Sequence, residues 1–318
     1  MQSIEFCAGA GGQALGLERA GFKHSALVEI DRDCVETLSM NRCGWDVRHA
    51  DMTTFDGRPF KGVDLFAGGL PCPPFSLAGK QLGENDERNL FPAAFRLIDE
   101  IKPKAIMIEN VRGFLSPVFE EYRVFIQARF KNLGFSAKWN LFNANDYGVS
   151  QLRPRVVIVA LRDDIKDMFD WPEPRKQKPP TVGELLIDLM SENGWEGAQE
   201  WAAGADTIAP TVVGGSKKHG GPDLGPTRAR TAWAAMGVEG RTIAEAAPEK
   251  GFVGMPRLTT RMVARLQGFP DDWKFYGRKT AAYRQIGNAF PPPVAAAVAR
   301  NLRIALATHR MFPVKSAA

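Results

Sequence analysis

A regular alternation of short β-rich runs with longer helical patterns, over the first 160 residues, most constrains the fold of this chain. Such an alternation predicts a mostly parallel sheet with helices on both faces, and therefore the α/β class. The predicted strands are Ile4–Cys7, Ser25–Ile30, Asp46–Ala50, Val63–Ala67, Ala105–Ile108, Ser136–Phe142 and Val156–Leu161. The predicted helices lie near Gln13–Ala20, Asp33–Met40, Leu90–Ile101 and Val118–Leu133.

The alternation breaks at a proline-rich basic stretch, residues 171–180, which is typical of a domain boundary. Beyond it, residues 181–254 form a helix near Val182–Met190 and then irregular, glycine-rich sequence suited to binding loops. The helical pattern resumes at Leu258, and the last helix, Pro293–Leu306, is rich in alanine and valine. We therefore expect a large domain over residues 1–170, a smaller irregular domain over 171–256, and a segment over 257–318 that completes the large domain.

Composition excludes several classes of protein. With 44% hydrophobic and 24% charged residues, the chain is able to bury a full core. It has no apolar run long enough to cross a bilayer, and its first residues lack the pattern of a signal peptide, so we expect a cytoplasmic protein without membrane contact. The four cysteines and four histidines show no metal-ligand or disulfide spacing, and we expect no metal.

Positive charge is concentrated late in the chain, whose formal net charge is +5. From Arg257 onward there are 11 basic residues against only two acids, Asp271 and Asp272. A polyanion is a natural partner for such a surface. A simply solvated basic face is the alternative.

A single cysteine stands in a stiff proline-rich loop, Pro71-Cys72-Pro73-Pro74-Phe75-Ser76, directly after a predicted strand. The prolines fix φ and remove backbone donors, so this segment is neither helix nor central strand. Cys72 is thus placed as a nucleophile would be, although a lone cysteine is more often a small buried hydrophobe.

An acidic residue, Glu109, ends the next predicted strand. If the two strands are parallel, Cys72 and Glu109 emerge at the same carboxyl edge, where open α/β sheets bind ligands. Without Cys72, Glu109 would be better explained as an ordinary strand-end acid or a helix N-cap.

A glycine-rich turn, Cys7-Ala8-Gly9-Ala10-Gly11-Gly12, follows the first strand and opens the first helix. Such a turn allows close approach of a ligand to the helix amides, but tight turns also need glycine for themselves. Glu29 and Asp51 end the second and third strands, where acids typically bind ribose and lie near a base. Because no Walker-type sequence is present, the pattern favours a nucleoside with a reactive tail over a triphosphate.

With these segments in place, the chain resembles the bacterial-type DNA (cytosine-5)-methyltransferases over nearly its whole length. The resemblance rests on segments in the order of the family: Ala8–Gly12, Pro71–Ser76, Glu109-Asn110-Val111, Asp146–Val149, Gln151–Arg155, Arg257-Leu258-Thr259 and Gln285–Ala289. Ser150 and Leu152 depart from the commoner proline and asparagine but leave both arginines in place.

The resemblance implies a Rossmann-like methyltransferase fold, with a catalytic and cofactor-binding domain and a target-recognition domain at residues 171–256. It implies that Cys72 is the nucleophile, that Glu109 partners the cytosine ring, and that Arg153 and Arg155 contact the base and active-site loops. S-adenosylmethionine would be bound by Phe6, Ala8, Gly9, Gly11, Gly12, Glu29, Ile30, Asp51, Met52, Pro71, Asn288 and Ala289. Double-stranded DNA would be contacted by Ser76, Lys80, Arg88, Gln151, Lys217, Lys218, His219, Arg228, Arg230 and Arg257.

One position departs from the family at the cofactor end. The family often has a phenylalanine that stacks on adenine where this chain has Cys7, and Phe6 points the other way by strand alternation. Which side chain covers the adenine is therefore open.

The implied chemistry needs covalent catalysis, because carbon 5 of cytosine is too weak a nucleophile until a thiolate adds at carbon 6. The base must also leave the duplex, and the polar segment Ser76–Asn89 is typical of a loop that closes over DNA. The segment Thr207–Val213 resembles the short threonine-containing recognition element of the family.

Two alternatives share this scaffold: an RNA cytosine methyltransferase, and a DNA-binding regulator without catalysis. The size of the recognition domain argues against the first, and the complete set of catalytic residues argues against the second. We expect a monomer that belongs to a restriction-modification system or acts alone, that has no direct contact with any cognate endonuclease, and that associates with the nucleoid when bound to DNA.

Overall fold

The computed structural model describes residues 1–70, 89–217 and 220–312, and the chain within it divides into two compact units. Unit 1 contains residues 1–142 and 154–173 and the segment from Val294 onward, and unit 2 contains residues 143–153 and 174–293. Each unit is described by itself.

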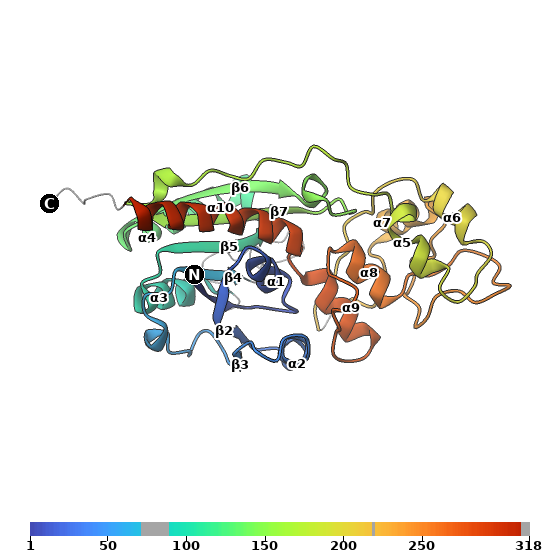
Figure 1. Ribbon diagram of the computed structural model, residues 1–318, viewed down its shortest axis with the longest axis horizontal. Coiled ribbons are helices and arrows are strands. Elements are labelled where there is room, and N and C mark those ends of the chain that lie inside the picture. The colour runs from blue at the N-terminus through green and yellow to red at the C-terminus, as the bar shows by residue number, and fades with distance from the viewer. Residues whose placement is uncertain (71–88, 218–219, 313–318) are drawn as a thin grey trace. The chain divides into compact units, whose positions relative to one another are not determined.

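Unit 1 is built on a seven-stranded sheet in the order β3-β2-β1-β4-β5-β7-β6 (Figure 1). The strands are β1 (Gln2–Phe6), β2 (Lys23–Glu29), β3 (Val47–His49), β4 (Leu65–Gly69), β5 (Ala105–Val111), β6 (Phe135–Asn143) and β7 (Pro154–Arg162). Its helices are α1 (Gly12–Arg19), α2 (Arg32–Asn41), α3 (Phe91–Ile101) and α4 (Glu120–Asn132), completed by α10 (Pro292–Met311). Short 3-10 turns lie at η1 (Arg58–Phe60), η4 (Arg112–Leu115), η5 (Pro117–Phe119) and η7 (Lys166–Met168).

Strand pairing confirms the prediction of a mostly parallel sheet. The pairs β1–β2, β1–β4, β2–β3 and β4–β5 are parallel, and β7 runs antiparallel to β5. The chain order reverses between β1 and β4, and open α/β sheets bind their ligands outside the carboxyl ends of the strands at such a switch point. The sheet therefore directs attention to the turn after β1 and the residues after β4.

Alternate residues of the strands face two separate apolar layers, as the period of a strand requires. Ile4 and Phe6 of β1 share one buried cluster with Ile106 and Ile108 of β5, and α3 and α4 contribute their apolar faces to the same cluster. The opposite face packs Leu27 of β2 with residues of α1 and α2. Helices on both faces confirm the predicted α/β class.

The last helix of unit 1, α10, is anchored to the residue before β4 by an ion pair with a buried acid, Asp64. Asp64, just before β4, is paired with Arg310 of α10 at 2.6 Å and with Lys104 at 2.8 Å. Burial acts to raise the pKa of Asp64, but hydrogen bonds from Lys104, Gln2 and Arg310 outweigh it and hold that pKa below its usual range. The end of the chain therefore completes the domain that the beginning builds.

Unit 2 contains short helices and long connections. Its helices are α5 (Val182–Met190), α6 (Ala198–Gly204), α7 (Thr227–Ala235), α8 (Thr260–Leu266) and α9 (Lys279–Asn288), with a 3-10 turn at η6 (Ala144–Tyr147). The helix predicted near residues 182–190 is present, but α6 and α7 lie where the sequence predicted irregular structure. Pro226 immediately precedes α7 and fixes φ before its first turn, a start signal that the glycine-rich composition concealed.

The division also places residues 257–293 with unit 2, whereas the sequence predicted that the chain rejoins the large domain at residue 257. Within residues 1–70, 89–217 and 220–312, no helix is long and apolar enough to cross a membrane.

Candidate active site

A buried ion pair lies at the carboxyl end of the central strands of unit 1. Glu109 of β5 and Arg155 of β7 approach to 2.7 Å between Oε1 and Nε, and both side chains are nearly buried. The register pairs Glu109 with Val157 and Val111 with Arg155, so the two charged residues are diagonal neighbours on one face of the antiparallel pair. Arg155 also donates from Nη1 to the Pro154 carbonyl at 2.8 Å, which restrains the guanidinium. The structure therefore brings together two of the predicted catalytic residues.

The carboxylate of Glu109 lies over the end of the neighbouring strand β4. Gly69 is the parallel partner of Glu109, and a β-carbon at Gly69 would lie 3.6 Å from Glu109 Oε2. Cys72 follows Gly69 by three residues in the sequence. Cys72 itself lies outside the described residues, as do Pro71, Ser76, Lys80 and Arg88.

The glycine turn after β1 is held open by an acid from β2. Gly9 and Gly11 have φ of 53° and 85°, in the region that favours glycine. The Glu29 carboxylate accepts the Gly9 N–H at 2.7 Å, and its other oxygen accepts the N–H groups of Ile30 and Asp31 at 2.9 and 2.8 Å. Burial raises the pKa of Glu29, and the three backbone N–H groups partly oppose that rise. Glu29 therefore fixes the shape of the turn.

Acidic groups surround Cys7 in this turn. Burial raises the pKa of the Cys7 thiol, and the negative charges of Glu29, Asp51 and Glu5 raise it further, so the thiol stays protonated. Its sulfur lies 3.6 Å from Met52 Sδ. The end of β1 is therefore an electronegative site lined by two soft sulfur atoms.

Phe6, which was predicted to contact the cofactor, turns its side chain into the core. Its ring has no exposed surface and stacks on Phe66 at 5.0 Å, with the edge of Phe55 at 5.4 Å. Strand alternation turns Phe6 into the core, whereas the next residue, Cys7, has a left-handed φ of 52° and begins the turn. The ring of Phe6 therefore lies in the core, and the predicted contact of this residue with the cofactor stays a prediction.

The remaining predicted cofactor residues of unit 1 gather at the same strand ends. Asp51 accepts the Thr53 N–H at 2.8 Å, and Met52 beside it is buried, with its carbonyl accepting a hydrogen bond from Arg96. Ile30, next to Glu29, exposes 63% of its surface. Ala8 is buried, and Gly12 begins α1.

Comparison of the chain with known protein families identifies the family to which it belongs. The C-5 cytosine-specific DNA methylase family matches residues 1–303. The chain belongs to this family. Its members methylate DNA at carbon 5 of cytosine, and this chain is a cytosine-5 DNA methyltransferase.

Individual relatives agree with the family. The methylase is 56% identical over 311 residues to the type II methyltransferase M.NgoMIV of Neisseria gonorrhoeae, covering 96% of this chain and 97% of that protein. It is 54% identical to the type II methyltransferase M.NaeI of Lentzea aerocolonigenes, covering 96% of this chain and 75% of that protein. The structure of a DNMT2 mutant from Spodoptera frugiperda aligns with a TM-score of 0.65 at 19% identity, over 95% of this chain and 99% of that one. This last likeness concerns the fold alone.

Arg153, the other predicted catalytic arginine, belongs to unit 2 and is 1% exposed. Its guanidinium donates to three backbone carbonyls, those of Val212 at 2.6 Å, Gly287 at 2.7 Å and Ala289 at 3.0 Å. These contacts hold the backbone of unit 2 at three places. The predicted contacts of Arg153 with active-site loops and with the base stay predictions.

Three more predicted residues lie in the same part of unit 2. Asn288, at the end of α9, is exposed and donates from Nδ2 to the Gly215 carbonyl at 3.0 Å, and Ala289 is buried. Gln151 was predicted to contact DNA, but it is 0% exposed, and its amide is fully engaged with Val212, Leu266 and Gln267. The Gln151 side chain is thus directed into unit 2, and its predicted contact with DNA stays a prediction.

The basic residues predicted to bind DNA occupy different settings. Arg228 and Arg230 lie on α7, not in a loop, and Arg228 is exposed. Lys217 is exposed, while Lys218 and His219 lie outside the described residues. Arg257 pairs through Nε with Glu239 at 2.6 Å, so its charge is partly neutralised.

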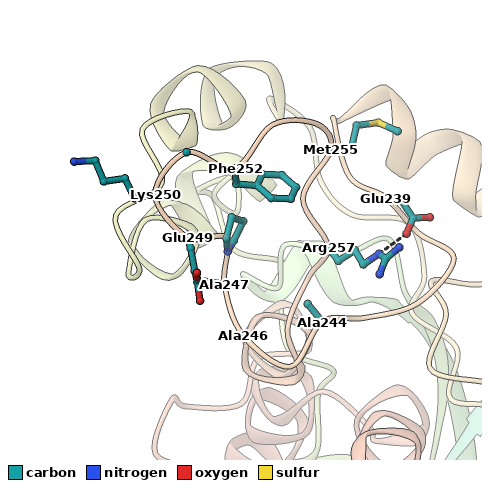
Figure 2. Close-up of a pocket in the computed structure, with 11 residues that line it drawn as sticks. Glu239, Ala244, Ala246, Ala247, Glu249, Lys250, Phe252, Met255 and Arg257 are labelled. Atoms are coloured by element: carbon teal, nitrogen blue, oxygen red, sulfur yellow. Dashed lines mark hydrogen bonds and ion pairs between the residues drawn. The ribbon is translucent and has the colours of Figure 1, made fainter.

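Arg257 also lines a cavity of about 680 Å³ in unit 2 (Figure 2). The cavity lies beside the connection between α7 and α8, and its wall combines small alanines with the Phe252 ring and the Glu239–Arg257 pair. Phe252 is fixed there by an edge contact with Trp195 and by a hydrogen bond from the Trp195 indole to the Phe252 carbonyl at 2.9 Å.

Sequence reasoning did not single out two buried polar residues. Gln267, 0% exposed, joins Gln151 to the Ala289 carbonyl, and no local motif marks it. Glu5 of β1 is 1% exposed, and burial raises its pKa well above the usual value. Glu5 could have been noticed from the sequence, because it is an acid in the middle of an apolar strand. No cluster of histidine, cysteine or acidic residues suited to a metal ion occurs in the part of the chain that the structure describes.

Proposed function

We propose that the methylase transfers a methyl group from S-adenosylmethionine to a flipped-out cytosine through a transient bond between Cys72 and carbon 6. The family establishes methylation of cytosine at carbon 5. The observation that carries the assignment of residues is the Glu109–Arg155 pair over Gly69, at the strand end that leads directly to Cys72.

The residues at the end of β1 fit S-adenosylmethionine. The turn at Gly9 has open space beside its α-carbon, and the carboxylates of Glu29 and Asp51 make the site electronegative around Cys7. A sulfonium and an ammonium group favour such surroundings. Glu29, Asp51, Ile30 and the backbone of the turn would hold the cofactor, with Cys7 and Met52 against its adenine. When bound, the cofactor supplies an electrophilic methyl group.

Each residue of the strand-end site has a distinct task. The Cys72 thiolate adds to carbon 6, and the electron pair of the 5,6 double bond becomes available at carbon 5. Glu109 hydrogen-bonds ring nitrogen 3 and the exocyclic amine, which stabilises the ring while sulfur is attached. Arg155 holds the Glu109 carboxylate in place. A base then removes the carbon 5 proton, the carbon–sulfur bond breaks as the 5,6 double bond forms again, and Cys72 returns as the thiolate.

Unit 2 would supply DNA recognition. The exposed basic residues Lys217 and Arg228 would contact phosphates or guanine edges, and Arg153 would position backbone. The curated relatives are type II methyltransferases, which supports a role as the modification enzyme of a restriction-modification system. We further propose that the protein acts in the cytoplasm on duplex DNA as a monomer, with catalysis in unit 1 and target recognition in unit 2.

Mechanism-based trapping tests this proposal. The purified protein is incubated with a duplex library containing 5-fluorocytosine, and with S-adenosylmethionine. We expect a stable adduct that peptide mass spectrometry maps to residue 72, and no adduct with Cys72→Ala. An adduct at another residue, or methylation retained by Cys72→Ala, would overturn the assignment. A parallel reaction with RNA tests the alternative of an RNA cytosine methyltransferase. That alternative predicts incorporation of the methyl group into RNA rather than into duplex DNA.

A further inference from the structure

Side-chain hydrogen bonds hold one extended segment of unit 2, residues 209–215, which we call the recognition segment. Its first residue, Ala209, is fixed by ordinary backbone pairing. The Leu152 N–H donates to the Ala209 carbonyl at 2.8 Å, and the Ala209 N–H donates to Ser150 at 2.9 Å. Thr211 then donates its hydroxyl to the Leu152 carbonyl.

At Val212, two side chains make the backbone hydrogen bonds that a neighbouring strand would otherwise make. The Val212 N–H donates to Gln151 Oε1 at 2.9 Å, and the Val212 carbonyl accepts from Arg153 Nη1 at 2.6 Å. Val212 is 0% exposed, whereas the next residue, Val213, is 50% exposed. The two side chains therefore determine which valine faces the interior.

Gln151 and Arg153 also connect the recognition segment, directly or through Gln267, to the backbone at the end of α9. Gln151 donates to Gln267 Oε1 at 2.7 Å, and Gln267 donates to the Ala289 carbonyl at 2.6 Å. Arg153 returns to the same carbonyl, so Gln151, Gln267, Ala289, Arg153 and Val212 form a closed ring of contacts. A buried network of this kind restrains the backbone segments that it joins.

Two glycines bring the backbones into direct contact beside this ring. A β-carbon on Gly214 would collide with the Arg284 carbonyl oxygen, and one on Gly287 would collide with the Gly214 nitrogen. Asn288 fastens the next residue by its hydrogen bond to the Gly215 carbonyl. The recognition segment is thus pinned at residues 209, 212, 214 and 215.

We propose that Gln151, Arg153 and Gln267 are positioning residues that fix the register of the recognition segment and thereby set how strictly the enzyme discriminates its DNA sequence. A slip of one residue in an extended segment exchanges its inner and outer side chains. Here it would bury Val213 and expose Val212 in its place. This inference rests on the proposed role of unit 2 in DNA recognition.

The discrimination ratio tests the inference. It is kcat/KM for the duplex that the wild-type chain methylates best in a random library, divided by kcat/KM for duplexes with one changed base pair. In Gln267→Met, loss of the amide should lower this ratio about tenfold, the effect of roughly one buried hydrogen bond. A purely structural role would leave the ratio unchanged, because the fraction of folded enzyme cancels.

Leu189→Ala is the matched control, since it removes a buried side chain of α5 in the same unit. We expect it to lose stability and keep the ratio. An unchanged ratio in Gln267→Met, or an equal loss in Leu189→Ala, would overturn the inference.

Hydrogen exchange provides a readout without DNA. In Gln267→Met, or in the milder Gln267→Asn, amides of residues 209–215 should exchange at least about tenfold faster, while those of β4 and β5 keep their protection. Unchanged exchange at 209–215 would contradict the ring of contacts. Methylation by the wild-type chain is measured in the same series, so a failure of the proposed function is separate from a failure of this inference.

Discussion

The two units hold their buried arginines in different ways, although Arg153 and Arg155 are two residues apart in the sequence. Arg155 of unit 1 faces the carboxylate of Glu109, whereas Arg153 of unit 2 is surrounded by three backbone carbonyls. In unit 1 the strands satisfy each other's backbone, and Arg155 pairs with a carboxylate and donates to the neighbouring Pro154 carbonyl. In unit 2 connections take the place of strands, and the arginine satisfies backbone itself.

The largest expected effect comes from removing the Glu109–Arg155 pair of unit 1, and it concerns turnover. Glu109→Gln keeps the shape of the side chain but removes the charge that faces Arg155, and we expect kcat to fall about 10²- to 10⁴-fold. Single-turnover methyl transfer to duplex DNA measures it. Glu18→Gln, which breaks the Glu18–Arg42 pair, is the control and should stay within threefold. Near-normal turnover of Glu109→Gln would show that the unit 1 pair is only structural.

The second effect concerns stability. Arg153→Met removes the Arg153 hydrogen bonds of the Val212 and Gly287 carbonyls and leaves the Ala289 carbonyl with Gln267 as its donor. We expect the unfolding free energy of unit 2 to fall by about 3 kcal/mol. Urea unfolding followed by hydrogen exchange of unit 2 peptides measures this change. Arg228→Met, at an exposed position of α7, should change it by less than about 0.5 kcal/mol. Equal losses in both variants would remove the distinction between the two settings.

The third prediction is a pH dependence confined to unit 1. Burial lowers the pKa of His24 from 6.5 to about 4. Between pH 6.5 and pH 4, His24 is protonated in the unfolded chain but stays neutral in the folded chain. The unfolding free energy therefore falls as the pH decreases toward 4. The loss should amount to about 2 to 3 kcal/mol.

Chemical unfolding of wild type and His24→Gln between pH 7 and pH 4 measures this contribution. Their difference isolates His24, whose ring contacts Ser3 Oγ and the Ala14 carbonyl, from the acids that titrate in the same range. Parallel curves for the two proteins would contradict the prediction.

The smallest effect is expected at the surface of unit 2. Glu239→Gln removes the carboxylate that pairs with Arg257, whose side chain is 51% exposed. Such pairs contribute at most about 1 kcal/mol, so Tm should fall by no more than about 4 °C and less in high salt. Differential scanning calorimetry at low and high salt measures it. A larger loss would mean that the Arg257 pair supports the cavity in Figure 2.

Unit 1 was the more predictable of the two from the sequence. Runs such as residues 105–108 combine apolar composition with a following Glu109, and the structure has strands where such runs were predicted. The glycine turn and the acids at strand ends also follow from chain order in a parallel sheet. Strand alternation predicts the burial of the Phe6 ring, whereas the left-handed backbone at Cys7 has no signature in composition.

Unit 2 was predicted less well, for a physical reason. Its order depends on contacts between distant residues, such as Gln151 with Gln267, and no local period reveals them. Arginine and glutamine are usually exposed, so the burial of Arg153 and Gln151 runs against their ordinary preference. Helix α7 was missed because alanine and arginine were read as part of a glycine-rich stretch.

The assignment of the segment from Val294 onward to unit 1 has a consequence for biosynthesis. The ribosome makes β4, with Asp64 at its start, long before it makes Arg310, the cation that pairs with this acid. A nascent chain therefore presents an incomplete first domain while some 120 residues of the second are translated. Chaperone dependence should be greatest during this interval and should end when α10 emerges from the exit tunnel.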